Sequence, residues 1–547
     1  MLGIWSIAKH TLAQCMRMKL AAAFIVLLTA ALIALPAQIT GDGTLAGQIR
    51  AFLAYGTGIS LGLLSLMTVF VGASLVSNDI RTRQIFTVAV KPVAKWQYIL
   101  GRWIGLVLFN AILLALGCAA IYLAASHLRS RASTDLGPVT LPDRRTVETE
   151  VFAARREIKP QPIDVDAALA RRVMELRNSG KYETAVTGWM DRTGLNRLEA
   201  ELRLIDQLRL QVAAKLQSIA PSRRMWWRFT DIEVAGREIK LNATILTAID
   251  EAGVIRFLTP ERFACRLWRR SPISVNGFDG RVSGIDRHAI AVSFPEQSAA
   301  RQRLSGLSAG DKAELSIKPV LQVTYLLTPG DSSALPDGKL RAWWRAHDGE
   351  SPGIQWTPLP DITHQKTSIS LSSGLIGEKG ELRFGILNDS PSSIEVLMRD
   401  VSLLYNVDTF ENNFVRASVL MLCQLAYLSA VSILAGSFVS FPVACLMCFV
   451  LGPFSLARNF LVTAANIDIG GDVDAMTWLA HYIFKPFYVL LPDFAKTMPG
   501  DRLVDGMDIS WAFVGNTAAS DVLIRAGFAL LAACLILHRR ELARVQV

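Results

Sequence analysis

Cysteine and histidine are scarce in this sequence, and they are not grouped. Of the seven cysteines, six lie in or beside apolar runs, and only Cys265 falls in the polar middle of the chain. The middle region therefore cannot form an internal disulfide. Cys445 and Cys448 have a CxxC spacing, but an apolar run encloses them, so we interpret both as packing residues. The seven histidines are scattered, and the sequence predicts no metal site.

The motifs of common catalytic folds are also missing. The sequence holds no GxxxxGK[ST] phosphate loop, no GxGxxG opening a helix, no GxSxG and no HExxH. Its apolar runs contain no chain of acidic residues that could relay protons. We therefore expect no catalytic residue, metal or cofactor on this chain. If the protein transports a substrate actively, the energy must come from another subunit.

Charge is low and unevenly spread. Charged residues make up 19% of the 547-residue chain, against about a quarter in ordinary soluble domains. Apolar residues make up 51% and collect in runs near both ends, whereas residues 130–400 have the composition of a soluble protein. Much of the net charge of +10 flanks the apolar runs, as anionic headgroups would favour, and no nucleic-acid motif accompanies it. We expect a membrane protein with a large soluble insertion and no nucleic-acid partner.

Six apolar segments are candidates for membrane spans. They are Leu20–Leu35, Phe52–Val76, Trp103–Ala125, Phe414–Gly436, Val443–Ala457 and Asp521–Leu537. Residues 1–18 read as an amphipathic helix on the membrane surface. A signal peptide is the alternative for the first span, but Leu35-Pro36-Ala37 is a poor cleavage site and more spans follow, so we favour an uncleaved span. Residues 475–492 are expected to be re-entrant or interfacial, and Arg525 is expected to extend toward headgroups.

Three basic clusters predict the topology. They lie before the first span, between the second and third spans, and after the last span. In a six-span chain all three fall on one side, which the positive-inside bias assigns to the cytoplasm. Both termini are then cytoplasmic, and the insertion lies outside the cytoplasmic membrane.

Between the third and fourth spans we expect two regions. Residues 128–222 read as a linker followed by helices, with apolar residues from Leu195 to Leu216 at three- and four-residue steps. That pattern suits a coiled-coil seam or stalk hairpin, and equally an amphipathic helix packed on its own domain. Residues 223–412 are rich in β-branched and aromatic residues between turn signals such as Asn276-Gly277, which predicts a β-sandwich, in one version a jelly roll.

The expected fold is thus a six-span α-helical membrane bundle with an inserted extracytoplasmic α+β domain. The domain boundaries are 1–127 for the N-terminal helix and spans one to three, 128–222 for the helical region, 223–412 for the β-sandwich, and 413–547 for spans four to six.

The stretch from Ser77 to Arg102 is both basic and half apolar. The sequence SNDIRTRQIFTVAVKPVAKWQYILGR suits a short helix at the membrane surface or against a partner protein. Lys91-Pro92 ends that helix, since proline disfavours helix at the preceding residue. Trp96, Tyr98 and Trp103 follow at the depth where amphipathic aromatic rings settle, and we expect them to be interfacial anchors. The simpler interpretation is a basic stop signal that only fixes topology.

This run resembles a loop of ABC-2 type transporter permeases, where an acidic residue, an apolar pair, a Lys-Pro and a Y-x-x-G-[KR] follow in order. The matching positions are Asp79, Ile85-Phe86, Lys91-Pro92, and Tyr98 with Gly101-Arg102. The amphipathic N-terminal helix, the six spans and the basic HRREL near the C-terminus are similar too. The resemblance covers about residues 1–127 and 414–547.

The resemblance implies a non-catalytic permease of a bacterial cytoplasmic (inner) membrane. It would pair with a second permease subunit, identical or different, and with cytoplasmic ATPase subunits that bind ATP and magnesium. Closure of the ATPases would push on the loop and shift the bundle between states. The family typically exports lipids, polysaccharides, drugs or proteins. The residues implied to contact the ATPase are Asp79, Arg81, Arg83, Ile85, Phe86, Lys91 and Pro92.

The large insertion departs from the family's usual short loop and leaves a second hypothesis open. The chain could instead be a membrane-anchored binding or scaffold protein without transport activity. In that case Trp343, Trp344 and Trp356 could stack on sugars. The alternative is that these rings belong to a sandwich core.

Overall fold

A computed structural model describes most of the chain. The described residues are 2–39, 41–82, 94–134, 137–162, 164–233, 239–250, 252–264, 266–267, 271–294, 299–317, 320–331, 335, 339–348, 355–359, 366–377, 380–458 and 491–539. They form two compact units, and each is described here by itself. The first unit is Met1–Ala154 with Asp408–Val547, and the second is Arg155–Val407.

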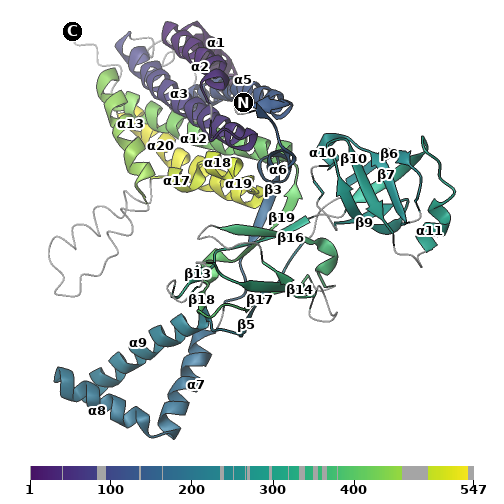
Figure 1. Cartoon of the computed structure of the whole chain (residues 1–547). Helices are drawn as coiled ribbons and strands as arrows, with labels where there is room; N and C mark the ends of the chain where they lie inside the picture. The colour runs from purple at the N-terminus through teal and green to yellow at the C-terminus, as the bar shows by residue number, and fades with distance from the viewer. Residues whose placement is uncertain are drawn as a thin grey trace, which may run out of the picture. The chain divides into compact units, whose positions relative to one another are not determined.

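The first unit is a helical bundle (Figure 1). Its long elements are α1 (Leu2–Arg17), α2 (Lys19–Gln38), α3 (Leu45–Arg81), α5 (Lys95–Arg129), α12 (Phe410–Phe438), α13 (Phe441–Leu456), and the continuous run of α19 (Trp511–Thr517), the π-helix Ala518–Ala526 and α20 (Gly527–Arg539). Five helices among the described residues are long and apolar enough to cross a membrane: α2, α3, α5, α12 and Trp511–Arg539. By length and composition these helices are compatible with an integral membrane protein. The shorter α13 has 16 residues, so the six-span count stays a prediction.

The helices extend beyond the apolar runs that predict them. Pro36, expected to end the first span, lies inside α2. The helix α3 has 37 residues, which is about 55 Å at 1.5 Å per residue, whereas a hydrocarbon core is about 30 Å thick. The hydropathy of a sequence reveals only the apolar part of a helix. Polar residues at its ends can also be helical, but they are not included in the predicted span. Consequently 77–81 belong to α3 and 95–102 to α5, so both ends of the expected loop are helical.

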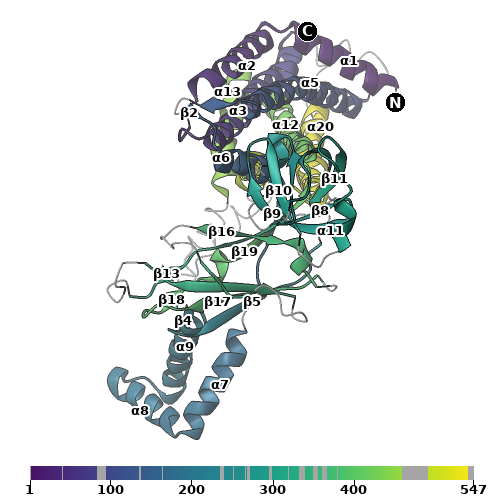
Figure 2. The ribbon, with the colours of Figure 1, turned by 45° about the vertical axis from the view of Figure 1, so that its right-hand side comes forward.

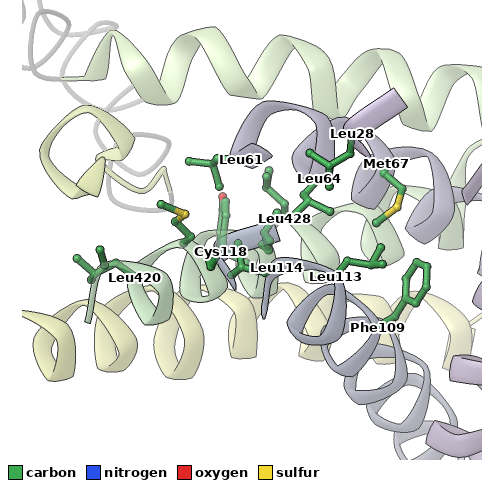
Figure 3. Close-up of a cluster of buried hydrophobic side chains, with 14 of the residues drawn as sticks. Leu28, Leu61, Leu64, Met67, Phe109, Leu113, Leu114, Cys118, Leu420 and Leu428 are labelled. Atoms are coloured by element: carbon green, nitrogen blue, oxygen red, sulfur yellow. The ribbon is translucent and has the colours of Figure 1, made fainter. Parts of the chain in front are cut away.

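Small residues let α3 lie at the centre of the bundle. A Cβ added to Gly72 would meet the Ser432 hydroxyl at 1.9 Å, and one added to Gly436 would meet the Ala73 carbonyl oxygen at 2.6 Å. The backbones of α3 and α12 therefore approach closely, as small residues allow in lipid. Leucines and Met67 from α2, α3, α5 and α12 pack together in the same core (Figure 3).

A polar layer crosses the same core. The Thr68 hydroxyl of α3 donates to Asn110 Oδ1 at 3.1 Å, and Asn110 Nδ2 of α5 donates to Ser429 Oγ of α12 at 3.3 Å. Asn110 is fully buried. Three helices are thereby joined at one depth, since an unsatisfied amide in an apolar core would cost several kcal/mol.

The amphipathic helix α1 packs along α5 through a GxxxG pair. A Cβ added to Gly101 would lie 2.7 Å from Ile7 Cγ2, and one added to Gly105 would lie 2.6 Å from both the Ala8 carbonyl oxygen and Thr11 Cβ. The two glycines thus let α1 rest on the α5 backbone.

At the opposite end of α3 a short collar follows α5. It consists of the strands β1 (Ser133–Thr134) and β2 (Gly137–Pro138), helix α6 (Leu141–Thr146) and the π-helical turn Val147–Val151. The Asp143 carboxylate accepts hydrogen bonds from the backbone N–H groups of Leu45 and Ala46, at 2.8 and 3.1 Å. These are orphan donors at the start of α3, where the helix dipole also favours a negative charge.

Ion pairs hold the collar end together. Arg129 at the end of α5 pairs with the buried Glu148, and Arg50 of α3 pairs with Glu150 at 2.7 Å. Arg416 of α12 bridges Asp408 at 2.6 Å and Asp508 at 3.0 Å. The latter aspartate follows the short helices α17 (Phe494–Thr497) and α18 (Pro499–Val504). Each of these pairs lies where the chain enters or leaves a long helix.

Three helices begin the second unit after strand β3 (Ala154–Ile158): α7 (Val165–Asn178), α8 (Lys181–Thr193) and α9 (Arg197–Leu216). They share a small core around Tyr182, Val186 and Leu204. The sequence predicted α7 and α9 but not α8. The helix α9 packs on α7 and α8 in one small helical unit, and Leu198 and Leu202 of its expected apolar stripe are exposed.

Two four-stranded sheets share one apolar core and form a sandwich. Their strand orders are β16-β12-β19-β3 and β15-β14-β17-β5. The strands β12, β14 and β17 pair antiparallel with both of their neighbours. The bounds are β5 (Arg224–Phe229), β12 (Val320–Tyr325), β14 (Ala342–His347), β15 (Thr357–Pro358), β16 (Thr367–Ser372), β17 (Leu382–Asn388) and β19 (Ser402–Asp408). A small sheet joins β13 (Thr328–Pro329), β18 (Ile394–Glu395) and β4 (Ser218–Ile219), and the 3-10 turns Ser373–Leu375 and Met398–Asp400 complete this body.

A closed six-stranded barrel is inserted between β5 and β12, and Figure 2 shows its strands curving around one another. The strand order is β10-β7-β6-β11-β8-β9. The bounds are β6 (Ile239–Thr247), β7 (Val254–Leu258), β8 (Pro272–Val275), β9 (Phe278–Ile285), β10 (Ala289–Ser293) and β11 (Lys312–Ile317), with the short helices α10 (Glu261–Ala264) and α11 (Ala299–Leu304). The buried side chains of Phe257, Val292 and Leu315 fill the barrel.

The expected single sandwich over 223–412 is therefore two β bodies with separate cores, and the jelly roll is unconfirmed. Barrel and sandwich strands have the same two-residue alternation, which records which face is buried but not which strands pair. The second unit is also nested, because the sandwich contains the barrel in sequence and begins with β3 before the helical unit.

The contact between α1 and α5 gives a stability prediction. Gly105→Ala should lower the thermal unfolding temperature of the detergent-purified protein, because its Cβ would meet α1 at 2.6 Å. Gly58→Ala in α3 is the matched control, since nothing lies within 4 Å of its Cβ. Alanine is intrinsically better than glycine in a helix by about 1 kcal/mol, so the control should be neutral or stabilising. Equal melting of the two variants would contradict this packing.

Candidate functional site

A pair of opposite charges is buried where α3 ends and α5 begins. Asp79 in the last turn of α3 is 2% exposed, and Arg102 in the second turn of α5 is 6% exposed. Their side chains form a direct ion pair. An isolated charge in this environment would cost several kcal/mol, so each group depends on the other.

Side chains from α1 and α5 complete this group, which we call the Asp79 cluster (Thr11, Gln14, Asp79, Tyr98 and Arg102). The Tyr98 hydroxyl donates to Asp79 Oδ2 at 2.5 Å, and Arg102 also donates to that oxygen. Arg102 Nη1 donates in addition to Gln14 Oε1 and, at 3.4 Å, to Thr11 Oγ1. The guanidinium therefore links α1 to the end of α3. It acts as a planar fork with several donors, a geometry that lysine does not have.

One carboxylate oxygen in the cluster is unsatisfied. Asp79 Oδ1 is buried and has no hydrogen-bond partner within the part of the chain that the structure describes. A buried acceptor without a partner costs roughly 1–3 kcal/mol. The cluster is thus held in this arrangement by surrounding packing, and a rearrangement that satisfied the oxygen would be favourable.

The end of the last helix reaches the same place. Lys95 Nζ at the start of α5 donates to the Leu537 and His538 carbonyl oxygens at 3.3 and 3.5 Å. A lysine at these last carbonyls satisfies orphan acceptors and complements the helix dipole. The helix α1 lies at this end too, through its contacts with α5. The described residues beside all three basic clusters are therefore at one end of the bundle. The side of the membrane that this end faces stays a prediction.

A hollow of about 670 Å³ adjoins the cluster. Its wall includes Gln14 of α1, Asn78 and Arg81 of α3, and the turn from Gly436 to Pro442 between α12 and α13. That uncharged turn therefore lies at the same end as α1. Gln14 faces both sites, because it lines the hollow and accepts the hydrogen bond from Arg102.

The structure describes only part of the expected contact set. Asp79 is enclosed in the bundle, so in this conformation its carboxylate has an internal partner in place of the expected surface contact. Arg81 is exposed and donates to Asn78 Oδ1 at 3.1 Å. The other members lie outside the described residues, and these are Arg83, Ile85, Phe86, Lys91 and Pro92. The expected re-entrant segment 475–492 lies almost entirely outside them too.

The three expected interfacial anchors have different environments. Trp96 is 53% exposed, and its role as an anchor stays a prediction. Tyr98 is buried and hydrogen bonded inside the Asp79 cluster, which does not suit an anchor. Trp103 is half-buried and donates from Nε1 to the Ala426 carbonyl oxygen at 2.9 Å, so it joins α5 to α12. The rotation of α5 decides these roles, and residue type alone does not show it.

The three tryptophans expected to stack on sugars do not share one face. Trp344 packs on the sandwich core, with its ring stacked on Phe384 at 6.2 Å between centroids. Trp343 points to the opposite face of β14 and donates from Nε1 to Asp389 at 3.1 Å. Trp356 lies 5.7 Å from Trp226, a ring that the sequence did not single out.

Arg525 also has a partner that the sequence did not indicate. It lies in the π-helix Ala518–Ala526 and pairs with Asp521, which is 1% exposed. The last helix begins at Trp511, ten residues before the expected start of the span. Arg525 is therefore held by a neighbouring carboxylate one helical turn away, rather than only by headgroups.

The sequence did not predict that Thr11, Gln14 and Arg102 form one group with Asp79. An amphipathic helix with Thr11 and Gln14 is recognisable, but its register against α5 is not. The GxxxG pair of Gly101 and Gly105 around Arg102 is the signal that could have found it, since it marks a close helix contact.

Removing one partner of the Asp79–Arg102 pair should destabilise the protein more than removing both. Arg102→Leu leaves a buried carboxylate alone, which should lower the unfolding free energy by about 3–5 kcal/mol. The double variant Asp79→Leu/Arg102→Leu should recover most of that loss, because no buried charge remains. Reversible denaturation in detergent micelles measures both, with the exposed Arg81→Leu as control. If the double variant were as unstable as Arg102→Leu alone, the unpaired carboxylate of Asp79 would not be the cause of the lost stability.

Comparisons of the whole chain found no matching family model, no matching curated protein and no matching solved structure.

Proposed function

We propose that this chain is the permease subunit of an ATP-driven ABC-2 type exporter, moved by a separate cytoplasmic ATPase that docks on the loop between α3 and α5. The observation that carries this proposal is the Asp79 cluster. It joins the two helices that flank the loop, and it ties both to the amphipathic helix α1.

The cluster suits a role in force transmission. A push on the loop acts on the last turn of α3 and the first turns of α5, and the buried ion pair makes these turns move as one piece. Since Arg102 also holds Gln14, the same push reaches α1. The α3–α12 contact at Gly72 and Gly436 then passes the displacement to the second half of the bundle. Closely packed helices shift between discrete arrangements more readily than they deform.

The hollow beside the cluster is the proposed seat for an ATPase side chain. It lies between the end of α3 and the α12–α13 turn, and its wall carries both apolar groups and the exposed Arg81. A partner that inserts there contacts Gln14 directly. In this proposal Asp79 is the internal anchor, and Arg81 with the loop residues makes the contact.

The second candidate is a membrane-anchored binding or scaffold protein without transport. The aromatic residues on one face of the sandwich favour it, because they suit a ligand-binding role that needs no movement of the bundle. The two candidates differ in whether an ATPase associates with the chain. Purification of the tagged full-length protein from its own membranes, followed by identification of any nucleotide-hydrolysing partner, separates them.

Charge reversal on the loop tests the coupling. Arg81→Glu/Arg83→Glu should leave the protein in the membrane but reduce ATPase association on the order of tenfold, because like charges across a contact cost several kcal/mol. Arg256→Glu/Arg281→Glu on exposed positions of the barrel is the matched control.

The readouts are the amount of ATPase retained and the transport-coupled ATP turnover in reconstituted vesicles. Retention and coupling equal to the control variant would refute the docking role of the loop. Absence of any ATPase from the purified protein would favour the scaffold.

A further inference from the structure

The outer face of the sheet β15-β14-β17-β5 gathers aromatic and cationic side chains. The strand register fixes which residues share this face. In β14 and β17, Trp344 and Phe384 point into the sandwich core, so their neighbours point outward. The residues that share the outer face are Arg224, Trp226 and Arg228 of β5, Arg383, Gly385 and Leu387 of β17, and Trp343, Arg345 and His347 of β14.

On this face the Trp226 ring contacts two other rings. Trp226 lies 4.9 Å from His347 in an edge-on arrangement and 5.7 Å from Trp356 at 56°. Trp356 immediately precedes β15, so the two tryptophans come from opposite edges of the sheet. Their rings meet above the central strands and form a continuous aromatic surface, which we call the Trp226 platform (Trp226, His347 and Trp356).

Glycine under the platform lets it lie flat. Gly385 is paired directly with Trp226 and with Arg345 on the two neighbouring strands. A Cβ at Gly385 would lie 2.6 Å from the six-membered ring of Trp226. The indole therefore covers the backbone of β17, and it presents a broad apolar surface without projecting away from the sheet.

Cations surround the platform. Arg345 and Arg383 lie beside His347 on the central strands, and Arg224 and Arg228 lie on the edge strand. Burial lowers the pKa of His347, and the positive charges of Arg345 and Arg383 lower it further. Three carboxylates offset part of this charge: Glu381 pairs with Arg228, Asp389 accepts from Trp343, and Asp348 lies close enough to His347 to oppose the lowering of its pKa. The face therefore has an excess of positive charge.

We propose that this face binds an anionic oligosaccharide, with sugar rings resting on Trp226 and Trp356 and acidic groups paired with Arg345 and Arg383. A pyranose has an apolar C–H face that suits a flat indole, and guanidinium groups bind carboxylate or phosphate in a bidentate manner. The excess positive charge is the reason for choosing an acidic sugar over a neutral one.

Two other anionic ligands fit less well. Insertion into a bilayer needs apolar side chains that project past the headgroups, whereas the Trp226 ring lies against β17. Nucleic-acid bases also stack on aromatic rings, but the proposed position of this domain outside the cytoplasm separates it from them. The exclusion of nucleic acid rests on the proposed function, because it uses the proposed location of this domain. The binding itself is independent of transport, and it would hold for the permease and for the scaffold.

The test uses the full-length protein in detergent micelles and calorimetric titration. The probes are an oligogalacturonate, a heparin oligosaccharide, a neutral malto-oligosaccharide of the same length, and an oligothymidylate. We expect at least one acidic sugar to bind about tenfold more tightly than the neutral one, with affinity that falls as salt is added. Equal affinity for the neutral sugar, tighter binding of the oligothymidylate, or no binding of either acidic sugar would overturn the proposal.

Variants identify the face. Trp356→Ala and Arg345→Gln should each weaken binding by about tenfold, the upper range for one aromatic or charged contact. Gly385→Ala removes no ligand contact but displaces the Trp226 ring, so it should weaken binding as well. Leu258→Ala and Arg256→Gln, both exposed on the barrel strand β7, are the matched controls. Thermal melting of each variant separates lost binding from lost folding, and unchanged affinity in a folded Trp356→Ala would also refute the platform.

Discussion

A single salt bridge, enclosed at one end of the bundle, decides how three helices meet. Asp79 and Arg102 are both nearly inaccessible to water, and neither could be buried as a charge without the other. Their pairing fixes the end of α3 against the start of α5, and the remaining donors of Arg102 hold Thr11 and Gln14 of α1. The close approach at Gly101 and Gly105 is what allows the guanidinium to reach α1 at all. Packing and electrostatics therefore depend on each other here, because the glycines bring the helices together and the ion pair sets their register.

The two ends of the bundle are held in different ways. At the collar end, several separate ion pairs and helix caps join short segments to the long helices, with Arg416 between Asp408 and Asp508 and with Asp143 at the start of α3. At the other end the Asp79 cluster joins α1, α3 and α5, and Lys95 holds the last helix. Among the described residues Asp79 Oδ1 has no hydrogen-bond partner, and a hollow lies beside the cluster. Under the proposed function, this end with fewer ties is the one that a docked ATPase would displace.

The sequence predicts the elements better than their partners. Long apolar runs showed where helices lie, because lipid requires every backbone group to be bonded within the segment. Their ends were wrong by several residues at α3 and at the last helix, since polar turns stay helical without an apolar signature. The β region was recognised from its alternation, but the barrel was merged with the sandwich, because alternation does not encode pairing. In the candidate site, the sequence singled out Asp79 as an expected ATPase contact, Tyr98 as an expected interfacial anchor and Arg102 as the end of the Y-x-x-G-[KR] match. Their meeting in one buried cluster was not predicted, because Arg102 lies 23 positions after Asp79 and the rotation of α5 is set only by tertiary packing.

The nested order of the domains has a consequence for biosynthesis. The central helix α3 packs most of all on α12, yet about 280 residues, 130–409, separate the end of α5 from the start of α12. At about 5–20 residues per second, the ribosome needs roughly 14–56 s to complete that stretch. During this interval Gly72 faces an empty position, and Asn110 has Thr68 but not Ser429 as a partner. The surface of α3 and α5 that α12 later covers therefore stays uncovered by its native partner until the insertion has been made.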